Sequence, residues 1–302
     1  MGRIDEALQR AGKASVLPAA PARTSTEAEV FASPWSFREP AGTDAAPVEE
    51  RAEARPAAVD AFPGTEVRTV GGLNPQWTER LVSAPHADPL MVEQFRQLAA
   101  TLHQAQAADN IRVVMITSAD AGDGKSLTAV NLALTLSDSY GRRVLLVDAD
   151  LRRPSLHEMA RIPNTHGLGD TLKSSAEQKL PVYRLSDTLM IVPAGQPDRD
   201  PMMALTSPRM QQILQEAAAR FDWILIDTPP MGPIADSSLL VPIIDAAILV
   251  VRAGRTHYAD IQRAITSIGR DRILGVVLNA AERGRHGGYR HYYYEADAVP
   301  PK

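Results

Sequence analysis

A glycine-rich loop in the middle of the chain carries the side chains with the most definite chemistry. Residues 118–126 read SADAGDGKS and lie between an apolar run at 113–116 and a helix-forming run at 127–133. In a loop of this pattern the glycines let successive backbone N–H groups converge on one phosphate. Lys125 then reaches the β- and γ-phosphates, and the Ser126 hydroxyl ligates Mg²⁺. Because the flanking strand and helix are both predicted, we expect a phosphate-binding loop rather than a chance glycine-rich turn.

Two further apolar runs end in aspartates. Residues 144–147 precede Asp148 and Asp150, and residues 224–226 precede Asp227. Runs that are apolar throughout are typical of parallel strands covered on both faces, and such sheets bind ligands beyond the carboxyl ends of their strands. A single aspartate at a strand end is usually a turn or cap residue. Three of them beside a phosphate loop predict instead that the carboxylates converge on the metal and phosphates.

The order of strands and helices predicts the fold class. After the phosphate loop and its helix we expect a strand at 144–148, a loop region at 157–185, a strand at 189–192, a helix at 207–220, strands at 224–227 and 246–252, a helix at 258–269 and a strand at 273–279. Strands that alternate with helices form parallel sheets through right-handed crossovers. The expected fold is therefore α/β, a doubly wound, mostly parallel sheet of the P-loop NTPase type with helices on both faces.

The N-terminal part of the chain has a different composition. Helical spacing of apolar residues predicts a short amphipathic helix over 3–13, which is marginal in water unless it docks on something. Residues 14–76 are rich in Ala, Pro, Ser, Thr and Glu without periodicity, which predicts a disordered linker. Asp88 and Pro89 predict the start of a helix that runs to about residue 107. The expected parts are an N-terminal region at 1–82, a folded domain at 83–284 and a flexible tail at 285–302.

Composition excludes several classes of function. The 302 residues carry a net charge of −4 with scattered arginines, which argues against nucleic acid as a partner. The absence of cysteine excludes disulfides, thiol chemistry and a cysteine-held iron–sulfur cluster. The longest apolar stretch, 246–251, is far shorter than the roughly 20 residues that cross a bilayer, and the N-terminus lacks the apolar core of a signal peptide. We expect a cytoplasmic protein that contacts a membrane only through a partner.

Tyrosines are concentrated near the C-terminus. Four of the seven, Tyr289, Tyr292, Tyr293 and Tyr294, follow the glycine- and arginine-rich residues 283–288. An edge strand or a few packed aromatics is one interpretation, because Tyr has a high strand propensity. The glycines before the cluster and the prolines after it favour a mobile tail that presents its hydroxyls to solvent. Phenols in such a tail are candidate phosphoryl acceptors.

Together these motifs resemble the bacterial tyrosine kinases of capsule and exopolysaccharide export systems. The resemblance covers about residues 85–295 and rests on the phosphate loop, the two aspartate-ended strands, the run VVRAG at 250–254 and the tyrosine cluster. The opening run GRIDEAL at 2–8 also resembles autokinases linked to exosortase-type loci. The resemblance implies a protein-tyrosine autokinase that transfers phosphate from ATP to its own C-terminal cluster in trans and regulates exopolysaccharide or capsule biosynthesis.

The resemblance also implies roles for single residues. Lys125 and Ser126 hold phosphate and metal. Asp150 and Asp227 serve the Mg²⁺ shell, and Asp148 is the candidate base for the tyrosine hydroxyl, although the division of roles among the three aspartates stays open. Asn279 is expected to contact adenine, with a turn-forming role as the alternative. The residues expected to bind ATP are Ala121, Gly122, Asp123, Gly124, Lys125, Ser126, Leu127 and Asn279.

The sequence departs from the family pattern at a few positions. The family's assembly motif places Glu, Arg and Arg at three-residue intervals on one helix, whereas this chain has Glu93, Arg96 and Ala99. The departure at Ala99 removes support for ring assembly through that helix. In the phosphate loop, Ala121 and Asp123 stand where the family prefers Pro and Glu, and both changes keep the backbone cradle.

In family members with a separate kinase chain, a membrane-bound polysaccharide co-polymerase, or chain-length determinant protein, supplies the cytoplasmic segment that activates the kinase. The resemblance therefore implies an activator of this kind. It also implies self-association, which phosphorylation in trans requires, and a location at the inner face of the membrane.

Two other functions fit parts of the sequence. A partition or septum-positioning ATPase switch shares the expected fold, but that class usually has a second lysine where this chain has Asp120, and the chain lacks a basic amphipathic C-terminal helix. A nucleotide-binding adaptor that only scaffolds polymer export is the other alternative. Phosphate on the tail would support a kinase. ATP turnover without phosphoprotein would support a switch, and the absence of both would support an adaptor.

Overall fold

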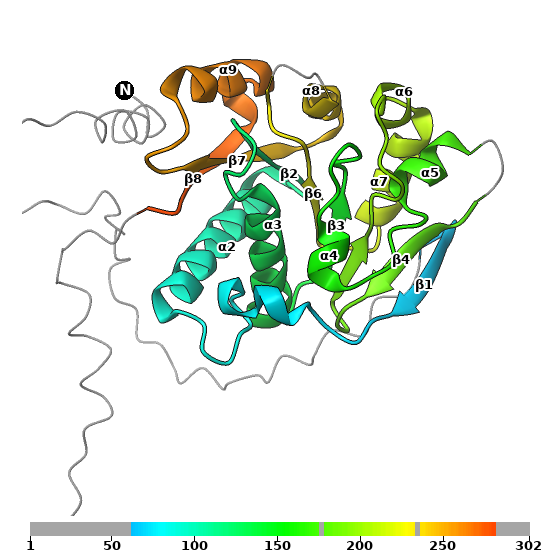
Figure 1. The fold of residues 1–302 in the computed structure, drawn as a ribbon, viewed down its shortest axis with the longest axis horizontal. Helices are drawn as coiled ribbons and strands as arrows, with labels where there is room; N and C mark the ends of the chain where they lie inside the picture. The colour runs from blue at the N-terminus through cyan, green and yellow to red at the C-terminus, as the bar shows by residue number, and fades with distance from the viewer. Residues whose placement is uncertain (1–61, 175–177, 233–235, 282–302) are drawn as a thin grey trace, which may run out of the picture.

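A central sheet lies between two layers of helices in the computed structural model, which describes residues 62–174, 178–232 and 236–281 (Figure 1). The eight strands have the order β1-β4-β5-β3-β6-β2-β7-β8. They are β1 (Thr65–Thr69), β2 (Val113–Ser118), β3 (Val144–Asp148), β4 (Leu180–Arg184), β5 (Leu189–Val192), β6 (Trp223–Asp227), β7 (Ala246–Arg252) and β8 (Ile273–Asn279). All neighbours run parallel except β4 and β5, which are antiparallel. The predicted α/β fold class is confirmed.

Helices cover both faces of the sheet. They are η1 (Pro75–Arg80), α2 (Pro89–Asp109), α3 (Lys125–Leu134), the π-helical η2 (Thr135–Ser139), α4 (Leu156–Ala160), α5 (Leu168–Lys173), α6 (Met202–Leu205), α7 (Pro208–Ala218), α8 (Asp236–Leu240), η3 (Val241–Ile243), α9 (Tyr258–Ile268) and η4 (Arg270–Arg272). Val114 and Ile116 of β2 share a core with α2, α3 and α4, whereas Val113 and Met115 share the other core with α5 to α9. Burial on both faces explains why the central strands are apolar throughout.

The central strands bring the predicted site residues to one edge of the sheet. β2 and β3 both pair with β6, and in this register Asp148 lies opposite Asp227 and Ile116 also lies opposite Asp227. β2 ends at Ser118, directly before the phosphate loop. Parallel strands therefore place the loop and the aspartates together at their carboxyl ends, as the sequence predicts.

The predicted disordered linker at 14–76 is wrong for its last part. β1 lies within it and pairs with β4 at the edge of the sheet, and Phe62 just before β1 packs edge-to-face against Phe221. β1 gives a weak sequence signal, because it is an edge strand in which only Val67 packs on the core. The sheet thus includes residues that precede the expected domain start at 83.

The predicted loop region at 157–185 also contains regular structure. α4, α5 and β4 all lie within or across it. Pro181 weakens the strand prediction for β4, because proline cannot donate to a ladder. The strand forms nevertheless, since it pairs in parallel with β1 and meets β5 only through Tyr183 and Arg184.

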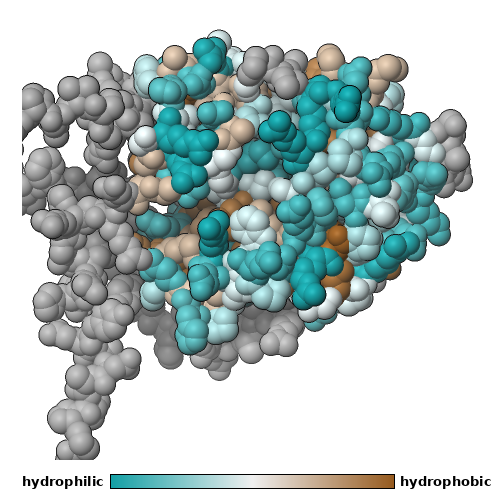
Figure 2. Space-filling view, in the orientation of Figure 1, coloured by the Kyte–Doolittle hydropathy of each residue, from teal (hydrophilic) through white to brown (hydrophobic). Residues whose placement is uncertain are grey.

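The predicted long helix that precedes β2 is confirmed. α2 begins after Asp88, whose carboxylate accepts the Leu90 N–H at 3.1 Å. The predicted helix at 3–13 and the tyrosine cluster lie outside the described residues. Within the described ranges, no helix has the length and apolar character needed to cross a bilayer. The face of the molecule in Figure 2 is mainly hydrophilic, with apolar colour in small separate areas.

Candidate active site

The phosphate loop has the backbone conformation that an anion cradle needs. Gly122 and Gly124 have φ angles of 83° and 97°, which residues with a side chain rarely adopt. A Cβ at Gly124 would lie 2.0 Å from Asn279 Nδ2, so a side chain here would have to displace the Asn279 amide. The first hydrogen bond of α3 runs from the Thr128 N–H to the Gly124 carbonyl at 2.9 Å. The N–H groups of residues 125–127 at the helix start therefore have no partner within the helix and suit a phosphate.

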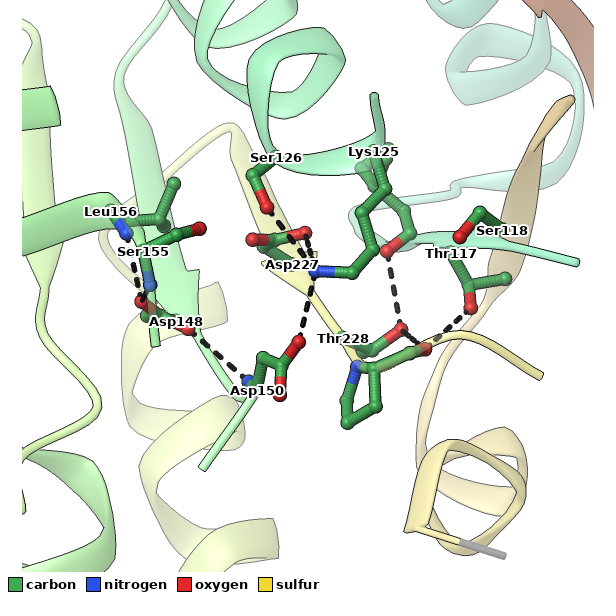
Figure 3. A network of polar contacts seen from close by, with 12 residues as sticks. Thr117, Ser118, Lys125, Ser126, Asp148, Asp150, Ser155, Leu156, Asp227 and Thr228 are labelled. Atoms are coloured by element: carbon green, nitrogen blue, oxygen red, sulfur yellow. Dashed lines mark hydrogen bonds and ion pairs between the residues drawn. The ribbon is translucent and has the colours of Figure 1, made fainter. Parts of the chain in front are cut away.

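Lys125 lies among carboxylates at the centre of the site (Figure 3). Its Nζ is 3.0 Å from Asp150 Oδ2, 3.6 Å from Asp227 Oδ1 and 3.2 Å from Ser126 Oγ. Burial lowers the pKa of Lys125, but the charges of Asp227 and Asp150 more than offset this effect, so the pKa is raised overall. The lysine is therefore a fixed cation, and a bound triphosphate would compete with these carboxylates for its Nζ.

Asp148 faces the loop after β3 rather than Lys125 (Figure 3). It accepts N–H groups from Asp150 at 3.2 Å, Ser155 at 3.1 Å and Leu156 at 3.0 Å, and its side chain is fully buried. Burial and the nearby charge of Asp227 raise the pKa of Asp148 to about 8. Its carboxylate therefore shapes the loop that carries Asp150. Its role as the catalytic base stays a prediction.

Asp227 has the features of a metal ligand. Its side chain is buried, and its oxygens accept no backbone N–H within the described ranges, while Lys125 Nζ lies 3.6 Å from Oδ1. Burial raises the pKa of Asp227 although Lys125 is close. No group of three or more His, Asp or Glu side chains is placed to hold a metal by itself within the described ranges. The donors fit Mg²⁺, which is usually bound through one or two carboxylates together with phosphate oxygens, and the Ser126 hydroxyl is a further donor.

The outer side of the phosphate loop is bonded to the segment after β7. Asp123 is fully buried, and its carboxylate accepts the Asp120 N–H at 3.0 Å and the Thr256 hydroxyl at 2.8 Å. Arg252 Nη1 donates to the Gly122 carbonyl at 3.1 Å. Sequence reasoning did not find Thr256. The only signal for it was its position just beyond the carboxyl end of an apolar strand, at the edge where the site forms.

Asn279 uses its amide within the protein. Its Nδ2 donates to the Asp123 carbonyl at 2.8 Å, and its Oδ1 accepts the Ala280 N–H at 2.8 Å. The second of these bonds is the turn-forming role that the sequence left open. Contact with adenine stays a prediction, and it would require the side chain to exchange one of these bonds.

The structure bears on the prediction about the assembly helix but not on the prediction about the acceptor tyrosines. Ala99 on α2 is fully buried in the core shared with α3, so its side chain does not face a neighbouring molecule. The four tyrosines predicted as acceptors, Tyr289, Tyr292, Tyr293 and Tyr294, lie outside the described residues.

The chain is similar to known proteins over about two thirds of its length. A family model described as ParA, NUBPL iron-transfer P-loop NTPase, matches residues 110–297. The tyrosine-protein kinase YwqD of Bacillus subtilis (strain 168) is 34% identical over 204 residues, which are 66% of this chain and 85% of YwqD. The succinoglycan biosynthesis transport protein ExoP of Rhizobium meliloti (strain 1021) is 31% identical over 218 residues, but these are only 27% of ExoP. The kinase domain of Escherichia coli tyrosine kinase ETK superposes with a TM-score of 0.59 at 27% identity, covering 65% of this chain and 77% of that domain.

The fold, the phosphate loop and the family model define the class of protein, a P-loop NTPase of the ParA type. Within this class, the identity to YwqD over most of that protein shows that the chain belongs to the bacterial tyrosine kinase family. The description of the family model mentions iron transfer, but the 302-residue sequence contains no cysteine that could hold an iron–sulfur cluster.

Proposed function

We propose that the protein is an ATP-dependent protein-tyrosine autokinase that phosphorylates its C-terminal tyrosine cluster in trans and regulates exopolysaccharide or capsule biosynthesis. The observation that carries this proposal is the buried lysine between two aspartates at the mouth of a phosphate loop, with Nζ 3.0 Å from Asp150 and 3.6 Å from Asp227. Membership of the bacterial tyrosine kinases supports the acceptor, and the similarity to a succinoglycan biosynthesis transport protein supports the pathway.

The proposed reaction is a direct phosphoryl transfer. A tyrosine oxygen forms a bond to the γ-phosphorus, the bond between this phosphorus and the β,γ-bridging oxygen breaks, and ADP leaves. The phenol proton passes to a carboxylate, for which Asp148 is the candidate. Lys125 and the N–H groups at the start of α3 neutralise and orient the phosphates, which supplies most of the rate in reactions of this type.

The proposed metal is Mg²⁺, held by Ser126, Asp150 and Asp227 together with phosphate oxygens. When bound, Mg²⁺ neutralises charge that develops on the phosphates. The Asp227 carboxylate supports this assignment, because it is buried and accepts no backbone N–H within the described ranges. Lys125 Nζ lies 3.6 Å from Oδ1, but it does not offset burial and the pKa of Asp227 stays raised, so a further cation would stabilise the charged carboxylate.

For the setting of the reaction, we propose activation by a membrane-bound polysaccharide co-polymerase and a location at the inner face of the membrane. We also propose self-association, which transfer in trans requires. The chain matches only 27% of ExoP, so the remainder of that longer protein has no counterpart in the matched part of this chain.

The test is to incubate the purified full chain with ATP and Mg²⁺ and to locate phosphate by mass spectrometry. Phosphate on Tyr289, Tyr292, Tyr293 or Tyr294 supports the proposal. A variant with all four changed to Phe should lose most of the label and still bind ATP. Undiminished label in that variant, or ATP turnover without any phosphoprotein, would contradict the proposed function.

A further inference from the structure

The segment between β7 and α9 makes an unusual set of contacts with the phosphate loop. Residues 252–256, named here the anchor segment, form a tight turn in which the N–H groups of Arg255 and Thr256 both donate to the Arg252 carbonyl, at 3.3 and 3.1 Å. The Arg252 N–H in turn donates to Thr256 Oγ1 at 2.9 Å. Because a carboxylate oxygen accepts, the Thr256 hydroxyl donates its single proton to Asp123 Oδ1, which lies 2.8 Å away.

Asp123 connects the anchor segment to the interior of the phosphate loop. Its second carboxylate oxygen accepts the Asp120 N–H at 3.0 Å, so one side chain closes the loop on itself and ties it to Thr256. The side chain is fully buried. A buried carboxylate that loses a hydrogen-bond partner is strongly disfavoured, so the two bonds hold the loop in one shape.

Two more contacts also hold the phosphate loop in this shape. Arg252 Nη1 donates to the Gly122 carbonyl at 3.1 Å, and Asn279 Nδ2 donates to the Asp123 carbonyl at 2.8 Å. The anchor segment and Asn279 are also joined, because the Ala253 N–H donates to the Asn279 carbonyl at 2.9 Å. Carbonyls bonded on the outside of the loop leave its N–H groups to point inward, which is the arrangement that binds phosphate.

We propose that Thr256 is a positioning residue for nucleotide binding, which acts through Asp123 to fix the phosphate loop before ATP arrives. Thr256 itself makes no contact with the nucleotide in this proposal. The bond joins residues 133 positions apart in sequence and spans two neighbouring strands, β2 and β7. The loop is thus ordered by the adjoining strand end as well as by its own glycines.

The first test measures binding of ATP with Mg²⁺ to the full chain by calorimetry. Thr256→Val keeps the size of the side chain and removes the hydroxyl, and we expect the Kd to rise about tenfold, equivalent to about 1.4 kcal/mol. Thr256→Ser restores the hydroxyl and should restore most of the affinity. Thr266→Val is the matched control, because Thr266 lies on α9 and its hydroxyl donates only to the Gln262 carbonyl. An unchanged Kd in Thr256→Val, or a loss that Ser fails to restore, would overturn the proposal.

The second test measures loop order directly. Amide hydrogen exchange at residues 122–125 should become faster in Thr256→Val and stay unchanged in Thr266→Val. In a double-mutant cycle, Thr256→Val should add little to Asp123→Ala, because both changes remove the same interaction. Additive effects, or unchanged exchange, would contradict the proposed route through Asp123.

A kinetic measurement separates this inference from the proposed function on which it rests. If the protein is the proposed autokinase, Thr256→Val should raise the KM for ATP by a factor similar to the change in Kd, with little change in kcat. A kcat loss at unchanged KM would contradict positioning of the free loop. If the protein showed no kinase activity, the proposed function would fail, while the calorimetry and exchange results would still decide the inference.

Discussion

The two ends of strand β6 use aspartate in opposite ways. Asp222, just before the strand, accepts the Arg143 backbone N–H at 2.8 Å and the Arg143 Nη2 at 2.6 Å. Asp227, at the end of the strand, accepts no backbone N–H among the described residues and has the Lys125 ammonium 3.6 Å from its Oδ1. Burial acts to raise the pKa of both groups, but the bonds from Arg143 lower that of Asp222 overall, whereas that of Asp227 stays raised with Lys125 beside it.

This difference separates charges that stabilise the fold from charges that await a ligand. A carboxylate whose acceptors are all used contributes to stability, while a buried one without donors costs stability. Asp245 extends the first pattern, since its carboxylate accepts the N–H groups of Arg112 and Val113, both at 2.8 Å, at the start of β2. The aspartates at the amino edge are therefore satisfied by backbone and arginine N–H groups, whereas Asp227 at the carboxyl edge has the Lys125 cation beside it and, in the proposed function, is completed by phosphates and metal.

The largest effect is expected at Lys125. Lys125→Met should reduce autophosphorylation by at least about 100-fold, because the lysine neutralises charge on the transferred phosphate. The fold should remain intact, since methionine is similar in length and, among the residues that the structure describes, the lost ammonium contacts only the site residues Asp150, Asp227 and Ser126. Phosphotyrosine measured after incubation with ATP and Mg²⁺ gives the first result and thermal unfolding the second. Strong labelling in this variant would count against the site.

A large effect on binding is expected at Gly124. Gly124→Ala introduces a Cβ that would lie 2.0 Å from Asn279 Nδ2, at a φ of 97° that alanine rarely adopts. We expect ATP affinity to fall by roughly 100-fold, equivalent to about 2.7 kcal/mol. Gly275→Ala in β8 is the matched control, because no atom lies within 4 Å of a Cβ built there. Calorimetry showing equal affinities for the two variants would contradict the close packing of Asn279 on the loop.

A moderate effect on stability, without loss of activity, is expected at the amino edge. Asp222→Asn should lower the free energy of unfolding at pH 7 by about 1–3 kcal/mol, because it weakens the charged hydrogen bonds with Arg143. The folded pKa of Asp222 is depressed, so its contribution is present above the unfolded pKa of about 3.9 and is lost as the pH falls through the folded value. The difference between wild type and variant should therefore shrink below about pH 4 in urea unfolding curves. A difference that grows on acidification would reverse this assignment.

The smallest effect is expected on the preference of the site for adenine over guanine nucleotides. Asn279→Ala removes the amide bond to the Asp123 carbonyl, and we expect a loss of affinity of about threefold to tenfold for ATP and GTP alike. Competition binding of the two nucleotides measures the ratio. A loss confined to ATP would show instead that Asn279 reads adenine.

Much of the fold follows from the sequence because the central strands are buried on both faces. The apolar runs that became β2, β3, β6 and β7 have no competing interpretation at their length, and their order defines a parallel sheet. β1 and β4 could not be predicted in the same way. β1 exposes most of its side chains and β4 contains Pro181, so each depends on the strand beside it for its stability.

The residue types of the candidate site can be predicted from the sequence, but the orientation of each side chain is harder to predict. The positions of Lys125, Asp150 and Asp227 follow from the loop pattern and the strand ends. The orientation of the Asp148 side chain toward Ser155 and Leu156 depends on the conformation of a loop, which the sequence does not specify. The bond between Asp123 and Thr256 joins distant residues of ordinary type, and only the assembled sheet brings them together.

The most direct test compares Asp227→Asn with Asp222→Asn in two assays, autophosphorylation with ATP and Mg²⁺ and thermal unfolding without nucleotide. Asp227→Asn should lose phosphate transfer by at least about 100-fold, with a Tm equal to or higher than that of the wild type. Asp222→Asn should show the reverse pattern, a lower Tm with transfer preserved. Transfer retained in Asp227→Asn, or a Tm that falls as far as in Asp222→Asn, would contradict the division of the sheet into a structural edge and a catalytic edge.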